Sequence, residues 1–185
     1  VVSQEANSLS ITQRTSGFID KMVELLEKKG IKTAVVGHDK FKNNVSESDA
    51  KAIIEVRVPA QVDDAAGKTE ASTVLEKSDT VAIYGSNEFA AKAIINANGS
   101  FKESKLGADK ILAVGFDSGA LQQDAIRNGL FVGSVTQDPI QIGYQSVKLA
   151  IEAAQGKEVK DVDTGSKWYD AKNIDSDEIK PLLYQ

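Results

Sequence analysis

Short apolar runs rich in β-branched residues alternate along the chain with longer stretches in which apolar residues recur every three or four positions. The first pattern is typical of buried strands, and the second is typical of amphipathic helices. Strands are predicted at residues 33–36, 53–58, 80–85, 111–116 and 131–136, with a further strand near Trp168 and Tyr169. Helices are predicted at residues 10–27, 64–77, 88–98, 121–128 and 140–155.

Two helix starts carry capping signals. Ser10 and Gln13 fit a capping box, in which each side chain satisfies a free backbone donor at the start of the helix. The apolar face of that first helix is expected to comprise Phe18, Met22, Leu25 and Leu26. Asp63 or Asp64 is predicted to cap the second helix in the same way.

This alternation predicts an α/β fold with an open, mostly parallel, doubly wound sheet and flanking helices. Crossovers between parallel strands are right-handed, so the carboxyl ends of the strands meet at one edge of the sheet. Ligands of such sheets bind at that edge. Functional side chains are therefore expected just after strands.

Polar side chains do follow three of the predicted strands. Asn87, Asp117 and Gln137 each come directly after a strand, and Arg14 lies in the first turns of the first helix. Asn and Asp at such places also cap helices, and this is the alternative for each residue taken alone. Together, a guanidinium, two amides and a carboxylate offer donors and acceptors to several hydroxyl groups at once, which suits a sugar.

Five segments carry a resemblance to a known family. They are residues 14–18 (RTSGF), 84–88 (YGSNE), 114–118 (VGFDS), 125–129 (AIRNG) and 133–144 (GSVTQDPIQIGY). In order and spacing they resemble the ribose-type periplasmic binding proteins, and they also resemble the ligand domains of lactose-repressor-like regulators. The resemblance covers residues 1–30 and 62–156, with the tail matching more loosely, and it implies a lobe of the type I periplasmic-binding-protein fold.

The resemblance also implies roles for individual residues. Arg14, Asn87 and Asp117 would bind sugar hydroxyls, Gln137 would be a further polar ligand near the hinge, and Phe116 would form a wall against the sugar ring. Residues 31–62 depart from the family pattern, because they offer two candidate strands with a polar loop between them. The family's ring-stacking aromatic residue could match either Phe41 or Val62, and the sequence leaves this open.

Domain organisation follows from the same resemblance. Residues 1–137 would form the C-terminal ligand-binding lobe without its opening helix. Residues 138–160 would be a helix and crossover that belong to an absent N-terminal lobe, and residues 161–185 would be a return strand and tail.

Composition narrows the classes of function. The 185 residues are 41% hydrophobic and 26% charged, with a net charge of −5 and no cysteine. The acidic balance argues against a nucleic-acid partner for this chain, and the lack of cysteine excludes disulfides and thiolate metal sites. Fragments that suggest catalysis, such as His38-Asp39 or Gly67-Lys68-Thr69, lack the rest of their motifs. We therefore expect no enzyme activity, no metal and no cofactor.

The function expected from the resemblance is that of the substrate-binding component of an ABC-type sugar transporter. Its ligand would be a monosaccharide or related polyol, held between two lobes, and its partner would be a membrane permease. Such a protein would be extracytoplasmic, either periplasmic or lipid-anchored at the cell surface. The alternative is the effector-sensing domain of a lactose-repressor-like transcription regulator, because the residues at the strand ends are shared by both groups.

Overall fold

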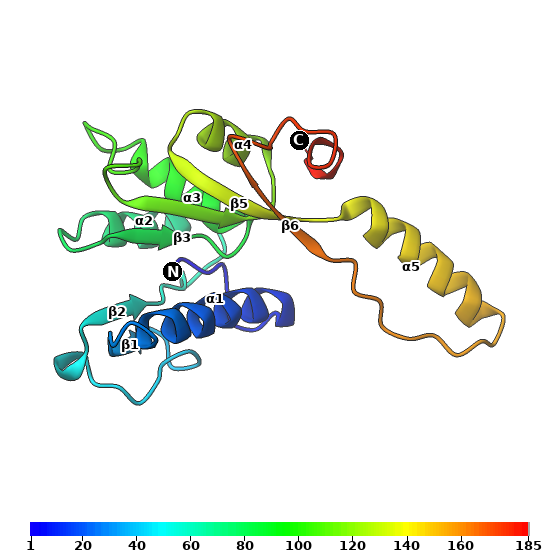
Figure 1. Cartoon of the computed structure of the whole chain (residues 1–185), viewed down its shortest axis with the longest axis horizontal. Helices are drawn as coiled ribbons and strands as arrows, with labels where there is room; N and C mark the ends of the chain where they lie inside the picture. The colour runs from blue at the N-terminus through cyan, green and yellow to red at the C-terminus, as the bar shows by residue number, and fades with distance from the viewer. Residues whose placement is uncertain (185) are drawn as a thin grey trace.

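Strands and helices alternate through the computed structural model, which describes residues 1–184 (Figure 1). The strands are β1 (Thr33–Val36), β2 (Ala52–Glu55), β3 (Ala82–Tyr84), β4 (Leu112–Phe116), β5 (Phe131–Gln137) and β6 (Ser166–Asp170). The helices are α1 (Leu9–Glu27), α2 (Asp64–Leu75), α3 (Glu88–Asn98), α4 (Ala120–Arg127) and α5 (Pro139–Ala154), with short 3₁₀ turns η1 (Glu47–Asp49) and η2 (Lys180–Leu182). Each predicted strand and helix is present, with ends shifted by a few residues.

The strands form one pair and one four-stranded sheet, and the N-terminal residues join the two. β1 pairs with β2 in parallel, while β3, β4 and β5 run parallel with β6 antiparallel at the edge. Val2 forms parallel bridges to both Arg57 and Gly85. Its amide donates to the Tyr84 carbonyl at 2.8 Å, and the Ser3 amide donates to the Arg57 carbonyl at 2.9 Å. The carboxyl ends of all the parallel strands therefore share one edge.

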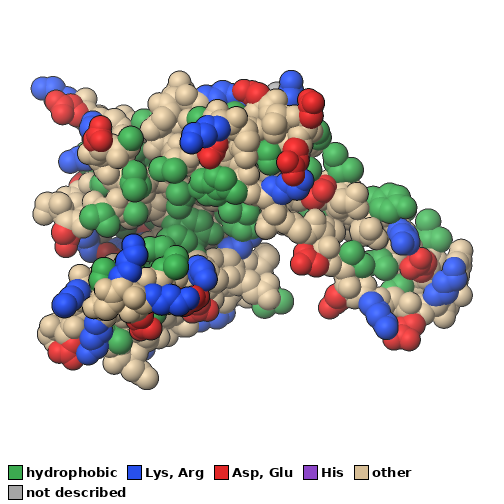
Figure 2. Space-filling model, viewed as in Figure 1, with side chains coloured by type: hydrophobic (Ala, Val, Ile, Leu, Met, Phe, Trp, Pro, Cys, Tyr) green, Lys and Arg blue, Asp and Glu red, His purple; other side chains and the backbone are tan. Residues whose placement is uncertain are grey.

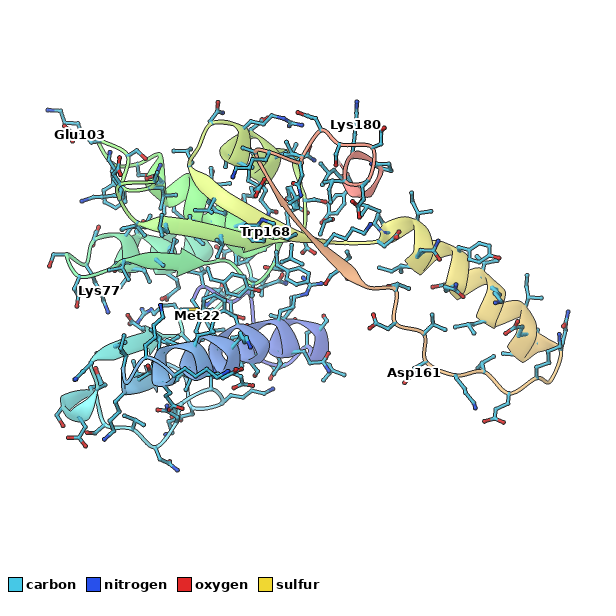
Figure 3. All side chains as sticks on the ribbon, viewed as in Figure 1. Met22, Lys77, Glu103, Asp161, Trp168 and Lys180 are labelled. Carbon is cyan, nitrogen blue, oxygen red and sulfur yellow. The ribbon has the colours of Figure 1, made fainter. Side chains whose placement is uncertain are left out.

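Two apolar cores lie on opposite faces of the sheet. Consecutive strand residues point to opposite faces, and accordingly Val2 and Ile83 join the core under α2, α3 and α4, while Val1 and Tyr84 join the core under α1. Met22 lies on the side of α1 that faces the sheet (Figure 3). Helices on both faces confirm the doubly wound α/β fold.

Helix α5 projects away from this body (Figure 1). None of its residues is buried, and its apolar side chains face outward along the projecting arm (Figure 2). The exposed set is Ile140, Ile142, Tyr144, Val147 and Ile151. The chain returns through an extended segment that includes Asp161 and enters β6, the strand that carries Trp168 (Figure 3).

Two predictions about α1 are wrong in detail. The N-cap of the helix is Ser8, two residues before the Ser10 that the capping box requires, and no side chain caps it. Ser10 therefore lies inside the helix, where its hydroxyl is 3.1 Å from that of Ser8. The fully buried line of the helix is Ile11, Thr15 and Ile19. Of the predicted face, Phe18 does pack against the core, whereas Leu25 is exposed. The line follows from the position of α1 against the sheet, which hydrophobicity alone does not fix.

Strand β2 is also shorter than predicted. It ends at Glu55 because the chain then leaves β1 and pairs through Arg57 with Val2. Among the helices of residues 1–184, none combines the length and apolar character needed to cross a membrane.

Candidate ligand-binding site

Asp117 occupies the centre of the strand-end edge. It directly follows β4, and its φ of 75° makes it the single non-glycine residue with a positive φ among residues 1–184. Its amide donates to the Val135 carbonyl at 2.7 Å, so the residue stays tied to the neighbouring strand β5. This backbone turn aims the carboxylate across the edge of the sheet instead of letting it cap α4.

Three groups from three different elements hold the Asp117 carboxylate. Arg14 Nη1 lies 3.1 Å from Oδ2, and the Glu88 amide at the start of α3 donates to the same oxygen at 3.1 Å. Gln137 Nε2 donates to Oδ1 at 2.9 Å. The side chains of Arg14 and Asp117 are only 14% and 11% exposed, so this is a largely desolvated charge pair with strong directional constraints.

An aromatic surface lies beside the charge pair. The guanidinium carbon of Arg14 sits 4.1 Å from the centre of the Phe116 ring, a cation–π arrangement that orients the arginine. Phe18 stacks on Tyr84 with 4.4 Å between ring centres. Burial raises the pKa of the Tyr84 phenol well above its usual value, so this hydroxyl stays neutral.

Asn87 caps α3 and also bonds to Gln4 at the strand-end edge. Its Oδ1 accepts from the Ala90 amide at 3.1 Å and thereby caps α3. Its Nδ2 donates to Gln4 Oε1. The amide is therefore a helix cap that keeps its donor end turned toward the strand-end edge.

The edge continues beyond Gln4 into a hollow of about 380 Å³. Residues 4–7, His38, Lys40 and residues 58–62 line it, and these segments follow the N-terminal strand, β1 and β2. Val62 lies in this lining and is 55% exposed, whereas Phe41 is 8% exposed and packs in the core under α1. Of the two candidates for a ring-contacting position, Val62 alone faces the edge.

The five residues singled out in the sequence thus gather at one edge. Arg14, Phe116, Asp117 and Gln137 form a connected cluster, and Asn87 adjoins it because the next amide, that of Glu88, bonds to Asp117. The cluster presents fixed donors and acceptors at the place where open α/β sheets bind ligands.

Comparison with known proteins identifies the family. The family described as a periplasmic binding protein domain matches residues 1–158. The chain belongs to this family. Its fold is the type I fold of periplasmic binding proteins, as the sheet order and flanking helices indicate.

Solved structures related to this periplasmic binding protein domain extend the comparison. A protein from Brachyspira murdochii, described as an ABC transporter, LacI family transcriptional regulator, is 33% identical with a TM-score of 0.70, over 94% of this chain and 65% of that one. An ABC transporter solute-binding protein from Agrobacterium vitis with bound D-fucose is 22% identical with a TM-score of 0.67, over 93% and 62%. A periplasmic component of an ABC-type sugar transport system from Hahella chejuensis is 24% identical with a TM-score of 0.66, over 90% and 51%.

The chain therefore spans between 51% and 65% of the length of these three relatives. A comparison with curated proteins returns no match.

Sequence reasoning missed several residues of the site. Gln4 follows the N-terminal strand and bonds to Asn87, and the same rule of strand ends would have found it. Tyr169, Gln122 and Ser134 all donate to the Asp117 carbonyl from beneath the edge. No spacing rule points to these three, because their common partner is a backbone atom.

Proposed function

We propose that this chain is the sugar-binding part of the substrate-binding component of an ABC-type sugar transporter, with a monosaccharide or related polyol as ligand. The observation that carries the proposal is the cluster of Arg14, Asp117 and Gln137 at the strand-end edge, in which mutual hydrogen bonds hold the three side chains in place. A preorganised site loses little conformational entropy on binding.

The cluster suits hydroxyl groups. A carboxylate has about four acceptor positions, so Asp117 keeps about one position for a sugar hydroxyl beside its bonds to Arg14, Gln137 and the Glu88 amide. The remaining N–H groups of Arg14 and the amide of Asn87 would donate to sugar oxygens. Phe116 on one side and Val62 on the other would contact the apolar faces of the ring.

Relatives with bound ligands support a small sugar. The Agrobacterium vitis proteins are described with D-fucose and with α-D-tagatopyranose, and an Agrobacterium radiobacter protein is described with D-arabinose. All three ligands are single sugar rings rich in hydroxyls. On this basis the protein would return its ligand unaltered, would act outside the cytoplasm and would deliver the sugar to a membrane permease.

We further propose that residues 138–160 belong to a second lobe, with residues 1–137 forming the first and residues 161–185 returning to it. Helix α5 supports this division, since it buries none of its residues against the rest of the chain. The greater length of the relatives is consistent with a second lobe. The ligand would then lie between the two lobes.

A second candidate is the effector-sensing domain of a transcription regulator. One observation favours it, namely that the Brachyspira murdochii relative is described as both a transporter and a LacI family regulator. The intact protein decides between the two: specific operator binding that a sugar modulates would support a regulator, and export from the cytoplasm would support a transport protein.

Calorimetry on the intact protein tests sugar binding. D-fucose, D-tagatose and D-arabinose would be titrated in turn, and mass analysis would follow the recovered sugar. We expect at least one of them to bind and to be recovered unchanged. Arg14→Ala should abolish this binding, whereas Arg127→Ala should not, because Arg127 forms only an exposed pair with Asp175 at 2.9 Å. Chemical turnover of the sugar that disappears in Arg14→Ala would contradict a binding protein, and so would equal affinity in the two variants.

A further inference from the structure

The backbone of Asp117 is held in a conformation that side-chain-bearing residues seldom adopt. A φ of 75° favours glycine, and an aspartate there is under strain unless its surroundings fix it. Its carbonyl oxygen is the point of fixation. Tyr169 Oη donates to it at 2.8 Å, Ser134 Oγ at 2.9 Å and Gln122 Nε2 at 3.2 Å.

The three donors come from three elements and are all buried. Gln122 lies on α4, Ser134 on β5 and Tyr169 on β6, and they are exposed by 1%, 0% and 0% respectively. Gln122 Nε2 also contacts the Phe116 carbonyl at 3.0 Å, while its Oε1 has no partner among the described residues. A buried acceptor without a partner costs free energy. The amide keeps this orientation because its Nε2 donates to the Phe116 and Asp117 carbonyls.

The neighbouring backbone leaves room for these donors. A Cβ at Gly115 would lie 2.9 Å from Gln122 Nε2 and 3.1 Å from Ser134 Oγ, so any larger residue would displace both groups. The antiparallel register places Tyr169 directly opposite Ser134, which brings both hydroxyls to the same carbonyl. These contacts form a clamp, defined here as Gln122, Ser134 and Tyr169 on the Asp117 carbonyl.

We infer that Tyr169 is a positioning residue for the ligand, acting through Asp117. By fixing the carbonyl it fixes the turn that aims the carboxylate at Arg14 and Gln137. Tyr169 lies on β6, the strand that returns from α5. The clamp therefore makes the geometry of the sugar-binding carboxylate depend on correct docking of the return strand, and this inference rests on the proposed function.

The first experiment needs no ligand, so its failure is distinct from a failure of sugar binding. A sugar-free crystal structure of intact Tyr169→Phe should show Asp117 with its φ out of the positive region, or its carboxylate beyond hydrogen-bond distance of Arg14 Nη1 or Gln137 Nε2. Tyr144→Phe removes the same atom from an exposed tyrosine of α5 and should leave Asp117 unchanged. An unaltered Asp117 in Tyr169→Phe overturns the inference.

The second experiment separates positioning from general structural damage. With whichever of D-fucose, D-tagatose and D-arabinose binds best, Tyr169→Phe should weaken affinity by about 2- to 12-fold, the loss expected for one hydrogen bond. In an Asp117→Ala background the same substitution should have no effect on affinity. An equal loss in both backgrounds would show a merely structural role and overturn the inference. Ser134→Ala, which removes another donor to the same carbonyl, provides the same test if Tyr169→Phe does not fold.

Discussion

At the scale of single residues, the site depends on small side chains as much as on charged ones. Gly115 has no functional group, yet the clamp on Asp117 fits only because Gly115 has no Cβ. Gly133 similarly lies under the ring of Trp168, where a Cβ would come within 2.3 Å of Cζ2. These glycines bring β4, β5 and β6 close enough for side chains to reach a backbone carbonyl.

The first prediction concerns Gly115. Gly115→Ala should lower the free energy of unfolding by about 1–3 kcal/mol, since the added methyl overpacks a buried site and displaces two donors. Urea unfolding followed by circular dichroism measures the change. Gly17→Ala is the matched control: a Cβ there has no neighbour within 4 Å, and alanine in a helix should raise stability by about 0.5–1 kcal/mol. Equal effects at the two positions would contradict the packing described.

The positions of the polar ligand candidates could be predicted because they follow from the topology of the sheet. Asn87, Asp117 and Gln137 end neighbouring strands, and parallel strands end at one edge, so their proximity follows from the strand order. The clamp could not be predicted, because a buried tyrosine such as Tyr169 has the same sequence pattern as an ordinary core residue. The contact with Asp117 depends on an antiparallel register that no local pattern specifies.

At the scale of elements, the N-caps of α1 and α2 differ, because only that of α2 has a side-chain hydrogen bond. Asp63 accepts from the Ala66 amide at 2.8 Å and fixes the start of α2, as its sequence position predicts. The predicted capping box of α1 fails because the helix starts at Leu9, with the Ser8 side chain making no cap bond. The Ser8 hydroxyl instead lies 3.1 Å from the Ser10 hydroxyl.

The second prediction compares these two caps. Asp63→Ala should lower the free energy of unfolding by about 1 kcal/mol, the usual loss for an N-cap side chain. Ser8→Ala should leave it nearly unchanged. Thermal or urea unfolding of the two variants side by side gives the comparison, and a larger loss for Ser8→Ala would show that the start of α1 is wrongly described.

At the scale of the whole molecule, the chain is a packed body with an exposed arm. Tyr144, Val147 and Ile151 are 62%, 63% and 53% exposed on α5, and no described segment covers them. The strand and helix pattern predicted the helix itself but not its isolation, because an apolar stripe has the same spacing whether it packs within its own chain or elsewhere. The family resemblance supplied the expectation of a second lobe.

The third prediction follows from that arm. The 185-residue chain alone should self-associate, because each large apolar side chain left in water costs about 1.5–3 kcal/mol. Light scattering across a concentration series measures the association. Tyr144→Ser with Val147→Ser should weaken it, and Lys148→Ser on the same helix should not. If the chain without substitutions is a monomer at every concentration, the role assigned to α5 is contradicted.

The most direct test of the account is the contribution of Asp117 to sugar affinity in the intact protein. Calorimetry would compare Asp117→Ala with Asp124→Ala, an exposed aspartate on α4, against whichever sugar the unchanged protein binds best. Losing a largely buried charged acceptor should weaken binding by about 2–4 kcal/mol, whereas Asp124→Ala should bind as the unchanged protein does. Unchanged affinity in Asp117→Ala would remove this carboxylate from the site and contradict the proposal that the strand-end edge binds the sugar.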